Sequence, residues 1–167
     1  MIVIADVGPA TQRDAARIVA LLEAAAEWMV ANGIRQWAPG EVRLADIEAQ
    51  VDGGEWCVAR SPTTVIAAFR LLLEDRTVWG HDDDANALYV HGLVIDRGYA
   101  GTGLGAGLLR WAAGHARELG ADLLRLDCVA SNQRLHDYYR GQGFREVGRR
   151  DFDRPVWSAV LFERSVR

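Results

Sequence analysis

Glycines gather where a strand is expected to lead into a helix. Gly101, Gly103 and Gly105 alternate with Thr102 and Leu104 in this segment. Glycine lets the backbone turn tightly and approach a ligand without a Cβ atom in the way. The helix expected from Leu104 directs its free N–H groups and the positive end of its dipole at this loop. Together these features predict a site for a phosphate or pyrophosphate group.

Two ligands would suit such a loop, and the first is a dinucleotide. Gly101, Gly103 and Ala106 satisfy the pattern Gly-x-Gly-x-x-Ala, and Asp127 ends the next expected strand, where a ribose-binding acid would lie. Residues 96–100 nevertheless separate the preceding strand from the first glycine, whereas a dinucleotide-binding turn follows its strand directly. This spacing makes a dinucleotide-binding oxidoreductase the alternative rather than the first hypothesis.

The second ligand is coenzyme A, and two motifs favour it. The first is the strand end Leu93-x-Ile95 followed by the segment Tyr99–Gly105. The second consists of Asn132, Leu135, Tyr138, Tyr139, Gly143 and Phe144. In this order, with a strand between them, the motifs resemble those of the GCN5-related N-acetyltransferase (GNAT) superfamily. The resemblance is strong over residues 87–147 and rests on element order alone in residues 1–75. It implies a GNAT-like fold and an acetyl-CoA-dependent N-acyltransferase.

The resemblance also implies how acetyl-CoA is held. Main-chain groups of the strand end would pair with the pantetheine arm, and the glycine loop would hold the pyrophosphate. The expected cofactor-binding residues are Leu93, Val94, Ile95, Ala100, Gly101, Thr102, Gly103, Leu104, Gly105, Ala106 and Asn132. Ala100 departs from the family pattern, which has Arg or Gln there to help hold the pyrophosphate. Arg97 is a candidate to replace that side chain, and no metal ion is expected.

Acetyl transfer to an amine needs a base, an oxyanion site and an acid for the departing thiolate. By resemblance, Tyr139 holds the position of the general acid. His91 is the candidate base, since its strand resembles the arylalkylamine N-acetyltransferase branch and the ordinary pKa of histidine, about 6.5, suits the task. The N–H groups near Val94 are the candidate oxyanion site, beside an irregularity expected at Gly92. The alternatives are a packing role for Tyr139 and a structural hydrogen bond for His91.

The acceptor is expected to be a primary amine of a small molecule or peptide. Trp28, Trp37 and Trp79 are candidate substrate-binding residues, in the first helix, the loop after it and a strand before an acidic loop. Asp127 is expected to orient His91 or to bind a substrate cation. Core packing for each tryptophan, and a solvent-facing strand end for Asp127, are the alternatives. Tyr138 is expected in the core, and the other histidines (His81, His115 and His136) at the surface.

Composition excludes several classes of protein. The 167 residues suit one domain, placed at residues 1–167. All 19 basic residues are arginines, which excludes a phosphate-binding loop that needs lysine and Schiff-base chemistry. The arginines are scattered and the net charge is −4, so no nucleic-acid partner is expected. Two distant cysteines and no long apolar run predict a cytoplasmic protein with no membrane association.

The periodicity of apolar residues predicts the order βααβββαβαββ, an α/β fold with a mixed sheet. Strands are expected at residues 2–5, 55–60, 63–73, 87–95, 123–129, 143–149 and 156–163. Helices are expected from Thr11 to Asn32, over 42–51, from Leu104 to Gly120 with Leu119 on its apolar face, and from a Ser131 cap to about 140. The protein is expected to be a monomer or a homodimer, with the last strand as the candidate dimer edge. A further alternative is a CoA-binding module that has lost catalysis.

Overall fold

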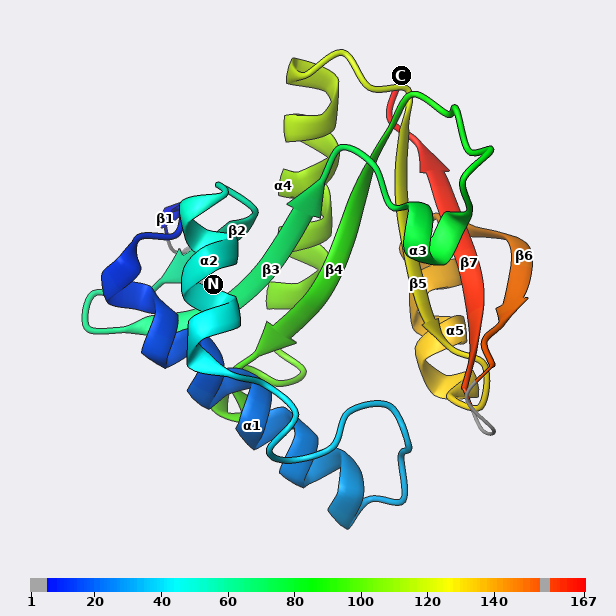
Figure 1. The fold of residues 1–167 in the computed structure, drawn as a ribbon. Coiled ribbons are helices and arrows are strands. Elements are labelled where there is room, and N and C mark those ends of the chain that lie inside the picture. The colour runs from blue at the N-terminus through cyan, green and yellow to red at the C-terminus, as the bar shows by residue number, and fades with distance from the viewer. Residues whose placement is uncertain (1–5, 154–156) are drawn as a thin grey trace. The chain divides into compact units, whose positions relative to one another are not determined.

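Strands and helices follow one another in the predicted order, with one short helix added. The computed structural model describes residues 6–153 and 157–167. The strands are β1 (Asp6–Pro9), β2 (Trp56–Arg60), β3 (Val65–Leu72), β4 (Ala87–Ile95), β5 (Leu123–Val129), β6 (Arg145–Asp151) and β7 (Ser158–Ser165). The helices are α1 (Ala15–Ala31), α2 (Leu44–Asp52), α3 (Arg76–Trp79), α4 (Leu104–Glu118) and α5 (Gln133–Gly141) (Figure 1). The predicted mixed α/β class is confirmed.

Contacts divide the chain into two compact units. The first takes residues up to Leu71 together with Gly92–Leu108, and the second takes Leu72–His91 together with Leu109–Arg167. The chain changes unit at the end of β3, within β4 and again within α4. The first unit holds strands in the order β1-β2-β3, and the second holds β5-β7-β6 beside the first part of β4. A single domain over 1–167 stays a prediction.

In the first unit, a reciprocal cap starts α1. The Asp14 carboxylate accepts hydrogen bonds from the Thr11 N–H at 2.7 Å and the Thr11 hydroxyl at 2.9 Å. The same carboxylate binds both terminal nitrogens of Arg60, at 2.6 and 2.9 Å. The helix ends at Asn32 and Gly33, where Gly33 takes a φ of +70° that favours glycine. The predicted cap at Thr11 thus begins a 3-10 turn, Gln12–Asp14, which leads into α1 at Ala15, and the predicted end at Asn32 is confirmed.

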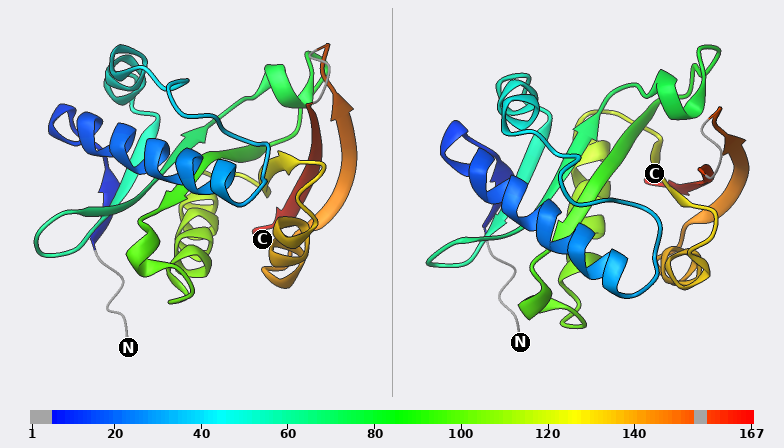
Figure 2. Two further views of the ribbon diagram at one scale, coloured as in Figure 1. Left: turned by 90° about the horizontal axis from the view of Figure 1, so that it is seen from below. Right: turned by 60° about the horizontal axis from the view of Figure 1, so that its bottom comes forward.

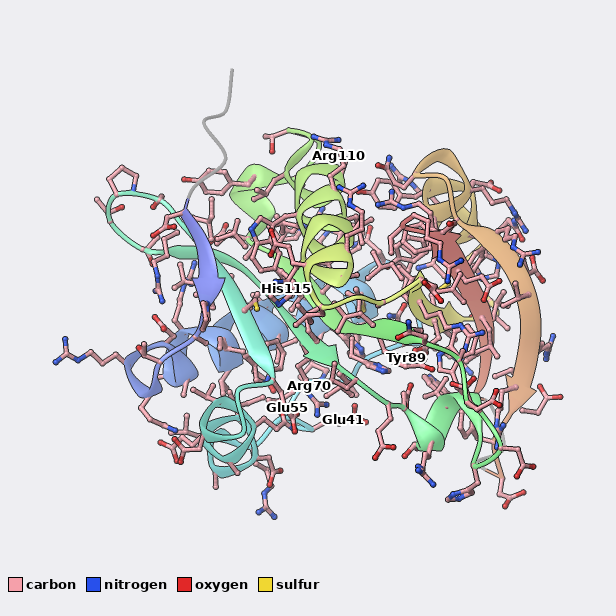
Figure 3. The ribbon with its side chains drawn as sticks, turned by 90° about the horizontal axis from the view of Figure 1, so that it is seen from above. Glu41, Glu55, Arg70, Tyr89, Arg110 and His115 are labelled. Atoms are coloured by element: carbon pink, nitrogen blue, oxygen red, sulfur yellow. The ribbon has the colours of Figure 1, made fainter. Side chains whose placement is uncertain are left out.

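The core of the first unit lies between its two long helices and its sheet. Figures 1 and 2 show α1 and α2 over the same face of β2 and β3. The buried cluster comprises Ile18, Leu21, Leu22, Ala25, Ile47, Val51, Trp56, Val58, Val65 and Ala68, among others. Burying each large apolar side chain contributes about 1.5–3 kcal/mol. At the sheet margin, Arg70 of β3 forms an ion pair with Glu55 just before β2 (Figure 3).

In the second unit, β5 runs parallel to β4 and antiparallel to β7. Ala87 pairs with Leu123 and Val90 with Leu126, so the next step of the parallel register places His91 level with Asp127. The other side of β7 pairs with β6 along the whole length of β6. The expected dimer edge at the last strand is therefore wrong, because β7 lies between two neighbours and β6 is the outer strand.

Several predicted boundaries shift or fail. The strand expected at residues 2–5 lies outside the described residues, and the first described strand is β1. Asn132, not Ser131, caps α5, because the Asn132 Oδ1 accepts the Leu135 N–H at 3.2 Å. Leu119 follows α4 and is 54% exposed, so it does not extend the buried face of that helix. The strands expected at 143–149 and 156–163 each begin and end two residues later.

None of the helices in residues 6–153 and 157–167 has the length and apolar character that a bilayer span requires.

Candidate active site

The glycine loop of the first unit has the geometry that its sequence predicts. Gly101 and Gly103 take φ values of +74° and +84°, a conformation that other residues rarely adopt. No atom lies within 4 Å of the place where either Cβ would stand, so the loop surface is open. The Thr102 hydroxyl donates to the Tyr99 carbonyl at 2.6 Å, and α4 begins at Leu104. The N–H groups at this helix start are therefore available to an anion.

Arg97, the candidate replacement for the side chain that position 100 lacks, lies against Trp28. Its guanidinium carbon lies 3.9 Å from the centroid of the Trp28 ring, a cation–π contact. Each side chain is thus engaged by the other. Trp28 would have to leave this contact to bind a substrate through the same ring face, and Arg97 would have to leave it to reach the pyrophosphate. Trp37, another predicted substrate residue, packs against the core cluster of the first unit.

The last residues of β4 carry the expected irregularity. Gly92 has a φ of +57°, and a Cβ there would stand 3.3 Å from Cη2 of Trp56. Val94 is buried, and beyond the strand the Asp96 N–H donates to the Ile66 carbonyl at 2.8 Å. The break at Gly92 turns the backbone just before Leu93, Val94 and Ile95, the segment predicted to hold the pantetheine arm.

In the second unit, His91 lies between two carboxylates. Its Nε2 is 2.8 Å from the Asp75 Oδ2, and its Nδ1 is 3.6 Å from the Asp127 Oδ1. The Asp75 and Asp127 side chains are only 6% and 10% exposed, and that of His91 is 20% exposed. The parallel register of β4 and β5 brings Asp127 to His91, whereas Asp75 comes from the start of α3. The sequence identified His91 and Asp127 but missed Asp75.

The cluster has an electrostatic character suited to proton transfer. Burial, opposed by the neighbouring His91 and aided by the charge of Asp75, raises the pKa of Asp127 to about 6. A carboxyl with a pKa near 6 exchanges its proton in the neutral range. Asp127 is therefore a buried strand acid beside a histidine, and the solvent-facing alternative for it is wrong.

The same three side chains are the one group in the described residues with the composition of a metal site. One potential ligand atom from each residue lies within 4.8 Å of the others. Asp75 faces one ring nitrogen of His91 and Asp127 faces the other, and an imidazole binds a given ion through one nitrogen only. The geometry is that of an imidazole with one carboxylate oxygen facing each ring nitrogen.

Tyr139, the candidate acid, is buried in the second unit on α5. Its ring contacts Phe144 and Phe162, with centroid distances of 6.0 and 5.9 Å. Burial raises the pKa of its phenol far above the usual range, and the charge of Asp127 adds to that effect. The phenol therefore stays protonated and keeps an O–H donor. Tyr138 is 38% exposed, so the expectation of a core role for it is wrong.

His136 corrects a further expectation. It is only 4% exposed, and its Nε2 lies 3.0 Å from the Val129 carbonyl. A surface position for this histidine is therefore wrong. The side chain of Asn132, expected to bind the cofactor, accepts the hydrogen bond that caps α5.

Trp79 lies in α3 and not in a strand. The Arg125 guanidinium carbon is 4.2 Å from its ring centroid, and the Tyr89 ring meets it edge-on at 5.7 Å. Arg125 in turn binds Asp83 at 2.8 Å and Glu163 at 3.0 Å, and Tyr89 donates to Asp83. The predicted strand position of Trp79 is wrong, and the network anchors α3 to β4 and β5.

Comparison with known proteins identifies relatives by sequence. The sequence model of the acetyltransferase (GNAT) family matches residues 22–144. A curated relative, the uncharacterized N-acetyltransferase YesJ of Bacillus subtilis, is 35% identical over 147 residues. That match covers 84% of this chain and 81% of the relative.

Solved structures agree at the level of the fold. An acetyltransferase of the GNAT family from Listeria monocytogenes has a TM-score of 0.79 at 22% identity, over 96% of this chain and 94% of that one. The Salmonella typhimurium protein yncA, solved with its cofactor acetyl-CoA, has a TM-score of 0.68 at 14% identity, over 97% and 94% of the two chains. The shared fold extends over nearly the whole length of each protein.

Proposed function

The chain belongs to the acetyltransferase (GNAT) family, and within this family we propose that it acetylates a primary amine of a small molecule or peptide. As a family member it is an acetyl-CoA-dependent acyltransferase. The observation that carries the proposal is the imidazole of His91 held between Asp75 and Asp127. The amine would attack acetyl-CoA directly, with both substrates bound at once.

The first unit would supply the cofactor site. The open glycine loop and the start of α4 offer backbone N–H groups to the pyrophosphate, which supports pyrophosphate binding despite Ala100. The main chain of Leu93, Val94 and Ile95 would pair with the pantetheine arm. The N–H near Val94 would stabilise the negative charge that develops on the thioester oxygen.

The second unit would supply the proton transfers. An amine reaches the enzyme mainly as an ammonium ion, and His91 would accept one of its protons. The amine nitrogen then bonds to the acetyl carbon, the carbon–sulfur bond breaks, and Tyr139 would give its proton to the departing thiolate. The second proton that the nitrogen loses as the amide forms would restore the phenol. Because burial raises the pKa of Tyr139, its phenol carries the proton that this role requires throughout the neutral range.

No cysteine is suited to carry the acetyl group. Both thiols are buried and unpaired, and burial raises the pKa of Cys57 to about 11 and that of Cys128 to about 12. Only the thiolate is nucleophilic, so direct transfer is favoured over an acyl-enzyme. Two unpaired cysteines also favour a reducing, cytoplasmic location.

The acceptor would be a cationic amine. Two carboxylates surround one imidazole in the second unit, and this excess of acidic groups attracts an ammonium ion. Asp127 is the proposed contact for it. Trp79 is the weakest of the three tryptophan candidates, because Arg125 and Tyr89 already cover its ring.

Substrate turnover tests the proposal. Purified protein is incubated with acetyl-CoA and a panel of arylalkylamines, polyamines and short peptides, and free CoA and acetylated amine are quantified. Parallel melting with acetyl-CoA, CoA and NADPH separates the alternatives, since a ligand at 100 times its Kd adds about 2.7 kcal/mol. Stabilisation by acetyl-CoA with amine acetylation supports the proposal. Stabilisation without turnover favours a binding module, and stabilisation by NADPH alone favours the dinucleotide site.

A further inference from the structure

We propose that Asp75 is a positioning residue that holds His91 through Nε2 and so leaves Nδ1 as the nitrogen that accepts the proton of the amine. This inference rests on the proposed function, in which His91 is the base. It adds a residue that has no counterpart in the motifs of the sequence, and it specifies which side of the imidazole reacts.

The contact between Asp75 and His91 is isolated from water. The Asp75 Oδ2 and the His91 Nε2 are both buried, and neither meets the angular criterion of a hydrogen bond with any group in the described residues. They lie 2.8 Å apart, so a hydrogen bond between them would satisfy both atoms. A buried donor and a buried acceptor without other partners are strongly favoured to satisfy each other.

Asp75 is itself held in place. Its other oxygen, Oδ1, accepts the Val78 N–H at 3.2 Å and caps α3. The last residue of that helix, Trp79, lies under the Arg125 guanidinium. One carboxylate thus has its two oxygens committed to two different tasks, and the helix that carries it is anchored to β5.

This arrangement distinguishes the two ring nitrogens. A neutral imidazole has one N–H donor and one lone pair. With the donor at Nε2 facing Asp75, the lone pair lies at Nδ1, on the side of Asp127. The Nε2 atom is fully buried although the side chain is 20% exposed, so the exposed part of the ring excludes Nε2. An ammonium ion near Asp127 would therefore present its proton to Nδ1.

Among the described residues, few titratable groups face His91 or its two aspartate neighbours. Asp75 faces His91 from the start of α3, and Asp127 faces it from β5. Tyr139 and Cys128 interact electrostatically with Asp127, and both stay neutral in the working range. Replacing the Asp75 carboxylate therefore removes one of the two acidic groups that face His91.

Two substitutions separate capping from positioning. Asp75→Asn keeps an oxygen for the α3 cap but presents an NH₂ group to Nε2, which favours the other tautomer. We expect kcat to fall about 100-fold or more, with the KM for acetyl-CoA and the Tm little changed. Asp75→Ser also keeps a capping oxygen but removes the carboxylate, and we expect a fall of at least 10-fold. Glu74→Gln is the matched control, because Glu74 is exposed and pairs with Arg76. Full activity in both Asp75 variants would overturn the proposal.

Nitrogen-15 NMR of the free enzyme gives a readout that does not depend on turnover. His91 signals are assigned by comparison with His91→Gln, and the tautomer is read from the nitrogen shifts of the neutral ring. Nε2–H in the wild type and Nδ1–H in Asp75→Asn would support the proposal. Nδ1–H in the wild type would overturn it even if amine acetylation is observed. Failure of the proposed function would instead appear as absence of amine acetylation by the wild type, whichever tautomer is found.

Discussion

Asp14 in the first unit and Asp127 in the second are both nearly buried aspartates, and their surroundings differ sharply. Asp14 accepts hydrogen bonds from the backbone and hydroxyl of Thr11 and from two nitrogens of Arg60. These donors lower its pKa to about 2. Asp127 has one imidazole at 3.6 Å, and burial raises its pKa to about 6.

The difference separates a structural from a chemical use of the same side chain. A carboxylate saturated with donors is stabilised as the anion and strengthens the fold. A carboxylate buried with few donors is destabilised as the anion, so its pKa rises, and such perturbed pKa values are characteristic of functional sites. In the first unit, the carboxylate of Asp14 is used to cap the start of the helix. In the second unit, the carboxyl group of Asp127 stays available for proton transfer beside His91.

The largest expected effect is on His91. His91→Gln removes the proposed base while keeping a polar side chain, so we expect kcat/KM to fall at least 100-fold with the fold intact. Steady-state kinetics and circular dichroism measure the two properties. His81→Gln, at an exposed histidine of the same unit, is the control. Wild-type kinetics in His91→Gln would remove the base assignment.

Tyr139→Phe should have an effect of similar or somewhat smaller size. The change deletes only the hydroxyl, and its ring contacts with Phe144 and Phe162 remain possible. We expect about a 100-fold fall in kcat. Because the pKa of Tyr139 is raised, the wild type should also show no loss of activity from tyrosine ionisation up to about pH 10. An unchanged kcat would reduce Tyr139 to a packing residue.

Asp14→Asn tests the structural side of the comparison. The variant leaves Arg60 without its anion, and we expect a loss of about 2 kcal/mol in the free energy of unfolding near neutral pH. Because the folded pKa of Asp14 is lowered, its contribution is present above about pH 4 and is lost as the pH falls toward 2. Urea unfolding across this range measures it, and a difference that does not shrink on acidification would contradict the assignment.

Asp127→Asn should have the opposite effect on stability. Because the folded pKa of Asp127 is raised, the wild type loses stability as the pH rises from about 4 to 6. The variant should therefore be more stable by about 1–2 kcal/mol at pH 8 and nearly equal at pH 4. It should also raise the KM for cationic amines. A loss of stability at pH 8 would show that Asp127 has a structural partner in the protein.

Much of the fold and part of the site could be predicted from local patterns. The cap at Thr11, the glycine loop and the strand at 87–95 depend on neighbours in the sequence, and all three are present. His91 and Asp127 were identified separately, but their proximity depends on the register of β4 against β5. A single step of that register would place other side chains level with each other.

The misses arise from tertiary contacts and from helix phase. Residues 76–79 include threonine, valine and tryptophan, which favour strands, yet the Asp75 cap and the contact between Trp79 and Arg125 make a helical turn. Asp75 reaches His91 only because that turn forms, so no motif could identify it. Tyr138 and Tyr139 are neighbours in sequence and so point about 100° apart around the helix. Tyr138, expected in the core, is therefore the exposed one, and Tyr139 is buried.

A carbon-13 NMR titration of the aspartate carboxyl groups tests the comparison most directly. The resonances of Asp14 and Asp127 are assigned with the Asp14→Asn and Asp127→Asn variants and followed from pH 2 to pH 8. We predict that Asp14 titrates near pH 2 and Asp127 near pH 6, in one sample under one set of conditions. Titration of Asp127 at or below pH 4 would contradict the account, because its carboxylate would then be as well satisfied as that of Asp14.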